Sequence, residues 1–175
     1  HLISFCKGNS FETYNMYFYK KFKSMESIFK IWETSRKQYL KFFDGYTLEQ
    51  LNRIPEGFSN NLIWNIGHII VAQQGLVYRL SGLPTYITDE MTNTYKNGSK
   101  PTAMTTQAEV DELKVLLMTL MEKTKDDFAK EKFSNYNEFT TSTGFHLATT
   151  KQAMEFNNYH EAIHLGFMMN IRKFV

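Results

Sequence analysis

The sequence predicts an all-α protein, a four-helix bundle whose helices are joined by long connections. Apolar residues recur at helical spacing in four long runs, at about residues 24–43, 60–80, 106–128 and 149–175. The stretches between them hold no convincing pair of strands, no glycine-rich phosphate loop and no internal repeat. Amphipathic helices must bury their apolar faces, and with two long connections a bundle is the simplest way to do so.

The first run is predicted to form a helix over about residues 24–43, and Gly45 follows as its stop signal. Residues at helical spacing form its inner stripe: Ile28, Trp32, Ser35, Tyr39 and Phe42. A short helical turn is predicted at residues 47–52, before a break at residues 55–57.

The second run is apolar on most of its sides, which predicts a central, heavily buried helix. Ser59 or Asn60 is expected to cap its start, and Leu80 lies near its end. Residues 84–105 then contain prolines and no long periodic run. A connection of this length is either a crossover along the bundle or part of a site.

The third run opens with Thr106 and Glu109 in the spacing of a capping box, so a helix is predicted to begin there. Residues 133–149 are polar and rich in threonine, and are predicted to be a loop. His146, in that loop, is expected to be an ordinary loop residue. The fourth helix is predicted to begin around Thr149 and Thr150.

We divide the chain into an N-terminal extension of uncertain order, residues 1–24, and a bundle domain, residues 25–175. The formal net charge is +2, which gives no reason to expect a nucleic acid or a membrane as partner. Cys6 is the single cysteine and fits a reducing compartment. The longest apolar stretch, residues 62–72, is too short to cross a bilayer. A cytoplasmic protein is therefore expected.

The last helix carries two histidines, His160 and His164, four residues apart on one face. They lie in a stripe that is predicted to face the core: Phe156, His160, Ile163, His164, Phe167, Ile171 and Phe174. A buried imidazole without a partner is costly, so something must satisfy both rings.

His68 lies inside the apolar second helix, and facing helices can bring it to His160 and His164. Three imidazoles and an open position are the arrangement of catalytic zinc sites. Imidazole also suits nickel, copper and iron, and we favour zinc or nickel. The alternative is that the histidines are core residues hydrogen-bonded to neighbours, and spacing alone leaves the two interpretations open.

Residues 160–164 also match H-E-x-x-H, the signature of zinc proteases. The longer metzincin form requires a glycine and a third histidine where this chain has Phe167 and Asn170. A third ligand must then come from upstream, where His68 is the best candidate. We do not expect a classical zinc protease.

At these residues the sequence resembles the DinB-like superfamily of small, metal-dependent bundle proteins. Similar segments are residues 62–69 (LIWNIGHI), 153–156 (AMEF), 160–166 (HEAIHLG) and the basic pair at 172–173. The resemblance spans about residues 25–175. It implies the bundle fold, and it implies that His68, His160 and His164 are the three metal ligands.

The resemblance also implies an activity and an assembly. Members are often homodimers, and characterised relatives include transferases and isomerases that use a low-molecular-weight thiol. The family commonly has a glutamine after the glycine, where this chain has Phe167. That departure weakens any inference about the polarity of the substrate pocket.

Two reactions on a small-molecule substrate are open at such a site. In a hydrolase the nucleophile would be metal-bound hydroxide, with Glu161 as its base; in a thiol transferase it would be a metal-bound thiolate. Glu161 could equally orient a ligand or be solvated, because it lies about 100° around the helix from His160. The competing class is a non-catalytic bundle in which a metal has a structural, binding or sensing role.

Overall fold

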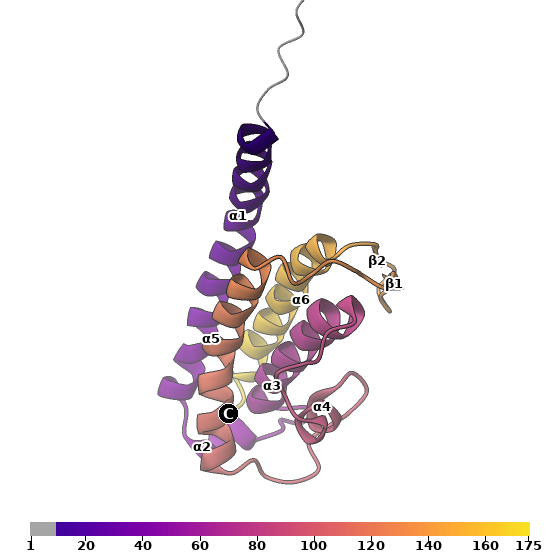
Figure 1. Cartoon of the computed structure of the whole chain (residues 1–175). Coiled ribbons are helices and arrows are strands. Elements are labelled where there is room, and N and C mark those ends of the chain that lie inside the picture. The colour runs from indigo at the N-terminus through magenta and orange to yellow at the C-terminus, as the bar shows by residue number, and fades with distance from the viewer. Residues whose placement is uncertain (1–9) are drawn as a thin grey trace, which may run out of the picture.

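The computed structural model describes residues 10–175, with side chains from residue 25 onward, and the prediction of an all-α protein is confirmed (Figure 1). Cys6 lies outside the described residues. The six α-helices are α1 (Ser10–Gly45), α2 (Leu48–Asn52), α3 (Leu62–Gln73), α4 (Asp89–Tyr95), α5 (Gln107–Ala129) and α6 (Thr150–Ile171).

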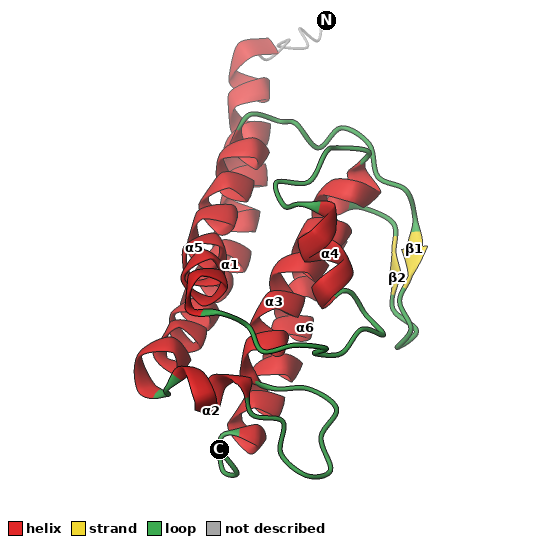
Figure 2. Cartoon of the chain, turned by 90° about the horizontal axis from the view of Figure 1, so that it is seen from below, coloured by secondary structure: helices red, strands yellow, loops and turns green. Residues whose placement is uncertain are grey.

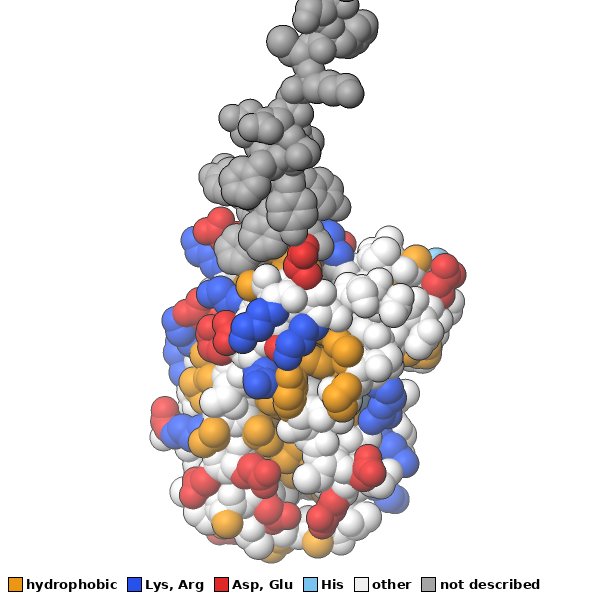
Figure 3. Space-filling model, in the orientation of Figure 1, with side chains coloured by type: hydrophobic (Ala, Val, Ile, Leu, Met, Phe, Trp, Pro, Cys, Tyr) orange, Lys and Arg blue, Asp and Glu red, His pale blue; other side chains and the backbone are white. Residues whose placement is uncertain are grey.

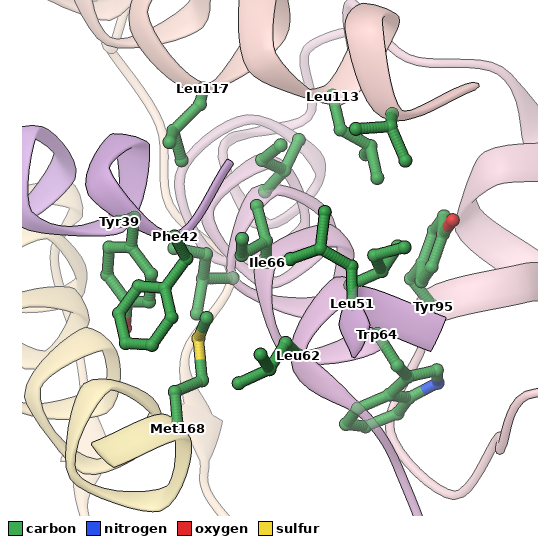
Figure 4. Packing of buried hydrophobic residues seen from close by; sticks show 14 of the residues in the cluster. Tyr39, Phe42, Leu51, Leu62, Trp64, Ile66, Tyr95, Leu113, Leu117 and Met168 are labelled. Carbon is green, nitrogen blue, oxygen red and sulfur yellow. The ribbon is translucent and has the colours of Figure 1, made fainter. Parts of the chain in front are cut away.

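The long helices pack side by side: α1 contacts α5 and α6, and α3 contacts the same two helices (Figure 2). Each long helix therefore buries one face against two others, as in a bundle. Figure 4 shows the core at one end, where Tyr39 and Phe42 of α1 meet Met168 of α6, and Leu117 lies on the α5 side.

Helix α1 begins at Ser10, well before the predicted start near residue 24, so the helix continues into the segment that we called an extension. The buried face of α1 also differs at one position from the inner stripe that the sequence predicted. Trp32, Arg36 and Tyr39 are fully buried, whereas Ser35, which was predicted to face inward, is only partly buried. From a sequence pattern alone, an arginine is expected at the surface. Arg36 can be buried because its charge is paired with another buried side chain.

Helix α3 is almost entirely buried, as predicted, but its cap is Asn61, whose side chain accepts a hydrogen bond from the Trp64 amide. The helix then continues as a π-helix, Gln74–Tyr78, and a short 3-10 turn, Arg79–Ser81. Gly82 ends it in the left-handed conformation that glycine adopts without strain.

Two connections contain structure that the sequence pattern did not predict. Helix α4 lies inside the connection of residues 84–105, with Thr88 as its cap. Two-residue strands, β1 (Phe139–Thr140) and β2 (His146–Leu147), pair antiparallel inside the predicted loop at residues 133–149. The capping box at Thr106 is present as predicted.

The stripe predicted for the last helix is wrong in part, because the side chains of Phe167 and Phe174 are 54% and 56% exposed. Ile171 alone of the stripe is fully buried. From residue 153 onward, the face that α6 turns to the core instead carries Ala153, Met154, Asn157, Glu161, Met168 and Ile171. Helix α6 is thus rotated so that two polar residues point inward and the histidine stripe lies at the edge of the core.

On the face shown in Figure 3, basic and acidic side chains lie among exposed apolar ones. None of the helices within residues 10–175 combines the length and the apolar character needed to cross a bilayer.

Gly67 of α3 packs directly against the ring of Tyr95. A Cβ at this position would lie 2.4–2.6 Å from three atoms of this buried ring, so the ring or the backbone of α4 would have to shift. Gly67→Ala is therefore expected to lower the free energy of unfolding by about 1–3 kcal/mol in urea denaturation. The matched control is Gly166→Ala, which meets nothing within 4 Å and should stabilise the helix by about 0.5–1 kcal/mol. A Gly67→Ala variant as stable as the parent protein would contradict this packing.

Candidate metal centre

The structure brings together the three histidines that the sequence singled out. His68 comes from α3, and His160 and His164 come from α6 one turn apart. One ligand atom from each ring lies within 4.8 Å of the others, and the Nε2 atoms of His68 and His160 are 3.2 Å apart. Two nitrogens at about 2.0–2.1 Å from a tetrahedral zinc ion would be about 3.3 Å apart. The observed spacing therefore fits one metal ion.

Hydrogen bonds fix the tautomers of two of these rings. His68 Nδ1 is 2.7 Å from the carbonyl oxygen of Tyr95, and His164 Nδ1 is 2.8 Å from Asn65 Oδ1. Each oxygen is an acceptor, so each Nδ1 carries the proton and the lone pair is on Nε2. Metal-binding histidines are usually oriented in this way, through the ring nitrogen that does not bind the ion.

Further contacts fix the position of the residues that orient these two rings. The side-chain amide of Asn65 donates to Asn60 Oδ1 and to the carbonyl oxygen of Asn61, so its Oδ1 must face His164. Trp64 stacks on His68 with ring centroids 4.8 Å apart and planes 8° apart. The orientation of these two rings therefore depends on α3, on the residues just before it and on the end of α4.

His160 differs from the other two, because its buried Nδ1 has no hydrogen-bond partner within the part of the chain that the structure describes. Its orientation comes from packing and from its Nε2, which faces His68 Nε2. Of the three rings it is the least constrained by hydrogen bonds.

Burial keeps all three imidazoles neutral at pH 7. Loss of solvation is the largest cause of the pKa shift in each case. It lowers the pKa of His68, and it lowers the pKa of His160 to about 4 and the pKa of His164 to about 3. Neighbouring imidazoles lower the last two further, since two charged rings would repel each other. A neutral imidazole is the form that binds a metal ion, so the site does not have to lose protons first.

Glu161, the middle residue of the motif, is fully buried, so the interpretation that it is solvated is wrong. Its Oε1 accepts hydrogen bonds from Arg36 Nη2 at 2.8 Å, from Arg36 Nε at 3.2 Å and from Asn157 Nδ2 at 2.7 Å. Arg36 also donates to the carbonyl oxygen of Leu117 in α5. Glu161 therefore joins α6 to α1 and, through Arg36, to α5.

Sequence reasoning missed Asn65, Tyr95 and Arg36, which orient the site. Asn65 was visible as a polar interruption three residues before His68 in an apolar helix. Tyr95 contributes its backbone carbonyl, which leaves no mark in a sequence. His146 lies on β2, is exposed and faces Glu138, so it is not part of the histidine cluster.

The fold and the cluster together define an all-α protein with three histidines, from two packed helices, that can hold one metal ion. The sequence profile of the DinB superfamily matches residues 31–168. The chain therefore belongs to the DinB superfamily. No curated protein shows a significant match to the sequence.

The lowered pKa values predict how stability depends on pH in the metal-free protein. The unfolded chain takes up protons on His160 and His164 near pH 6.5, whereas the folded protein takes them up only near pH 4 and below. The unfolded state thus binds more protons between these values, and the free energy of unfolding falls as the pH falls. Each histidine contributes up to about 1.4 kcal/mol per pH unit.

Urea denaturation at pH 7.5, 6 and 5 in the presence of a chelator measures this slope. His164→Gln should make the slope smaller, because it removes one of the two imidazoles whose pKa is lowered most. A stability profile of the parent protein that is flat from pH 7.5 to 5 would contradict the assignment.

Proposed function

We propose that this chain binds one divalent metal ion through His68, His160 and His164 and acts as a metal-dependent enzyme on a small molecule. The observation that carries the proposal is the pair of hydrogen bonds from His68 Nδ1 and His164 Nδ1, which place the protons on Nδ1 and leave the lone pairs on the Nε2 atoms. The Nε2 atoms of His68 and His160 are 3.2 Å apart, which is close to the spacing of two imidazole ligands on one tetrahedral ion. Zinc and nickel are the ions that we propose, since imidazole suits both.

The number of ligands favours catalysis over a structural role. Closed structural zinc sites use four protein ligands, whereas catalytic sites use three and keep one position open. Within residues 25–175, the cluster that could hold an ion consists of three histidines and contains no cysteine or carboxylate. A non-catalytic bundle that binds a metal for stability would be expected to supply the fourth ligand.

The chain's own residues would bind and orient the ion, and would keep water from the buried side of the site. When bound, a divalent ion supplies Lewis acidity and lowers the pKa of a coordinated water or thiol. Hydrolysis and transfer of a low-molecular-weight thiol both fit that chemistry. The thiol cosubstrate, the homodimer and the cytoplasmic location stay predictions.

Glu161 stays a proposed base, and the structure limits how it could act. Its Oε1 is occupied by Arg36 and Asn157, whereas its Oε2 has no hydrogen-bond partner among the described residues. A proton would therefore have to be taken up on Oε2. The alternative is that Glu161 only positions α6, through its ion pair with Arg36.

Removing a ligand or its orienting partner should lower the affinity for metal by different amounts. His160→Ala removes one of three ligands and is expected to weaken zinc binding by about 100-fold or more. Asn65→Ala leaves all three ligands but frees the His164 ring, and a loss of about 10–100-fold is expected. Competition with a chromophoric chelator measures both affinities.

His146→Ala is the matched control, because it removes an exposed histidine outside the cluster and should leave zinc affinity unchanged. If His68→Ala and His160→Ala bind zinc as tightly as the parent protein, the proposed site is wrong.

The reaction can be tested by offering the metal-loaded protein a thiol with an electrophile, and separately an ester or amide. We expect turnover in one of the two assays that disappears in His160→Ala.

Glu161→Gln also breaks the ion pair with Arg36, so the pH profile must separate the two roles of Glu161. Loss of a base should lower kcat by about 100-fold and remove its decline toward acid pH. A kcat that is reduced equally at every pH would show that Glu161 acts by positioning.

A further inference from the structure

An unbroken row of rings runs along one face of α6 with the histidines at its middle. Phe156 lies 6.2 Å from His160, His160 lies 4.6 Å from His164, and His164 lies 6.4 Å from Phe167, all between ring centroids. Phe145, from the turn between β1 and β2, extends the row by contacting Phe156 at 5.2 Å. These are the contact distances of packed aromatic side chains.

Much of this row is open to solvent. Phe145 and Phe167 are exposed, as is Tyr159, which packs on Phe145 and Phe156. The imidazoles of α6 are themselves only partly buried, so the cluster is reached from this side. The exposed aromatic side chains thus lie at both ends of the row, and exposed apolar groups of this kind can mark a ligand-binding surface.

The charge around the cluster limits what could cover it. No carboxylate among residues 25–175 pairs with the three imidazoles, and Glu161 is neutralised by Arg36. Three neutral imidazoles would leave a bound divalent ion with its full charge of 2+. An anionic ligating atom would satisfy that charge, while the aromatic rings on either side would accept an apolar body.

We propose that the substrate of this site is a small molecule with an aromatic or alkyl body and one anionic, metal-ligating group, which lies between Phe156 and Phe167. This inference rests on the proposed function, because the ligating group needs the metal ion. The occupant is taken to be a small molecule because the rings contact the imidazoles themselves. A group that approaches the imidazoles from the partly exposed side of α6 passes beside these rings.

Two hydroxamates test the inference, because they share the ligating group and differ only in its substituent. Benzohydroxamate carries a phenyl ring and acetohydroxamate a methyl group. Titration of the cobalt-loaded protein, followed through its visible absorption, gives a dissociation constant for each without an activity assay. We expect benzohydroxamate to bind about tenfold more tightly, as contact with two aromatic side chains would give.

Phe167→Ala should reduce this preference to about threefold or less while cobalt still binds. Phe174→Ala is the matched control: Phe174 follows the end of α6 and is about as exposed as Phe167, but its ring contacts Phe58, at 5.9 Å, and no imidazole. It should keep the full preference. Because both residues are exposed, neither change should prevent folding.

Each other outcome has a distinct meaning. If cobalt binds and the two hydroxamates have equal affinities, the aromatic site is wrong and the metal site stands. If cobalt does not bind, the proposed function fails and this inference fails with it. If Phe167→Ala instead converts a dimer to a monomer in sedimentation, and the hydroxamate preference is unchanged, the rings are an interface between copies of the chain.

Discussion

The ion pair between Arg36 and Glu161 is the interaction on which the rest of the site depends. Both side chains are fully buried, and the guanidinium also binds the carbonyl oxygen of Leu117, so one group joins α1, α5 and α6. Burying two charges costs several kcal/mol per ion, which only close contact and further hydrogen bonds offset. Asn157 donates one such bond to the carboxylate, and the Tyr39 hydroxyl separately holds α6 to α1 by donating to the backbone carbonyl oxygen of Glu161. The rotation of α6 is thereby fixed.

Helix α3 supplies the opposite side of the site by different means. It is buried nearly all round, so apolar packing holds it in place but does not orient individual polar groups. Asn65 and the Tyr95 carbonyl do that, each through one hydrogen bond to a histidine. Gly67 lets the Tyr95 ring approach α3 closely, which brings that carbonyl to His68. A glycine that binds nothing thus helps to set the tautomer of a candidate ligand.

Local sequence signals predicted those parts of the structure that local interactions determine. The capping box at Thr106 and the helical spacing of His160 and His164 needed no knowledge of the rest of the chain. The inward position of Arg36 could not be found in that way, because its partner lies 125 residues away. The same holds for helix α6, where periodicity favoured the aromatic stripe as the buried face. Hydrophobicity ranks phenylalanine above glutamate, and only the pairing with Arg36 reverses that order.

The wrong prediction of the buried face of α6 and the exposure of the histidine cluster to solvent have the same physical cause. Residues one apart on a helix point about 100° apart, so burying Glu161 turns His160 toward the edge of the core. Phe156 and Phe167, on the same face as the histidines, turn outward with them. Had the aromatic stripe faced the core, its imidazoles would have been enclosed with no route for a ligand. A charged pair in the interior thus leaves the histidines both held by α3 and accessible from outside.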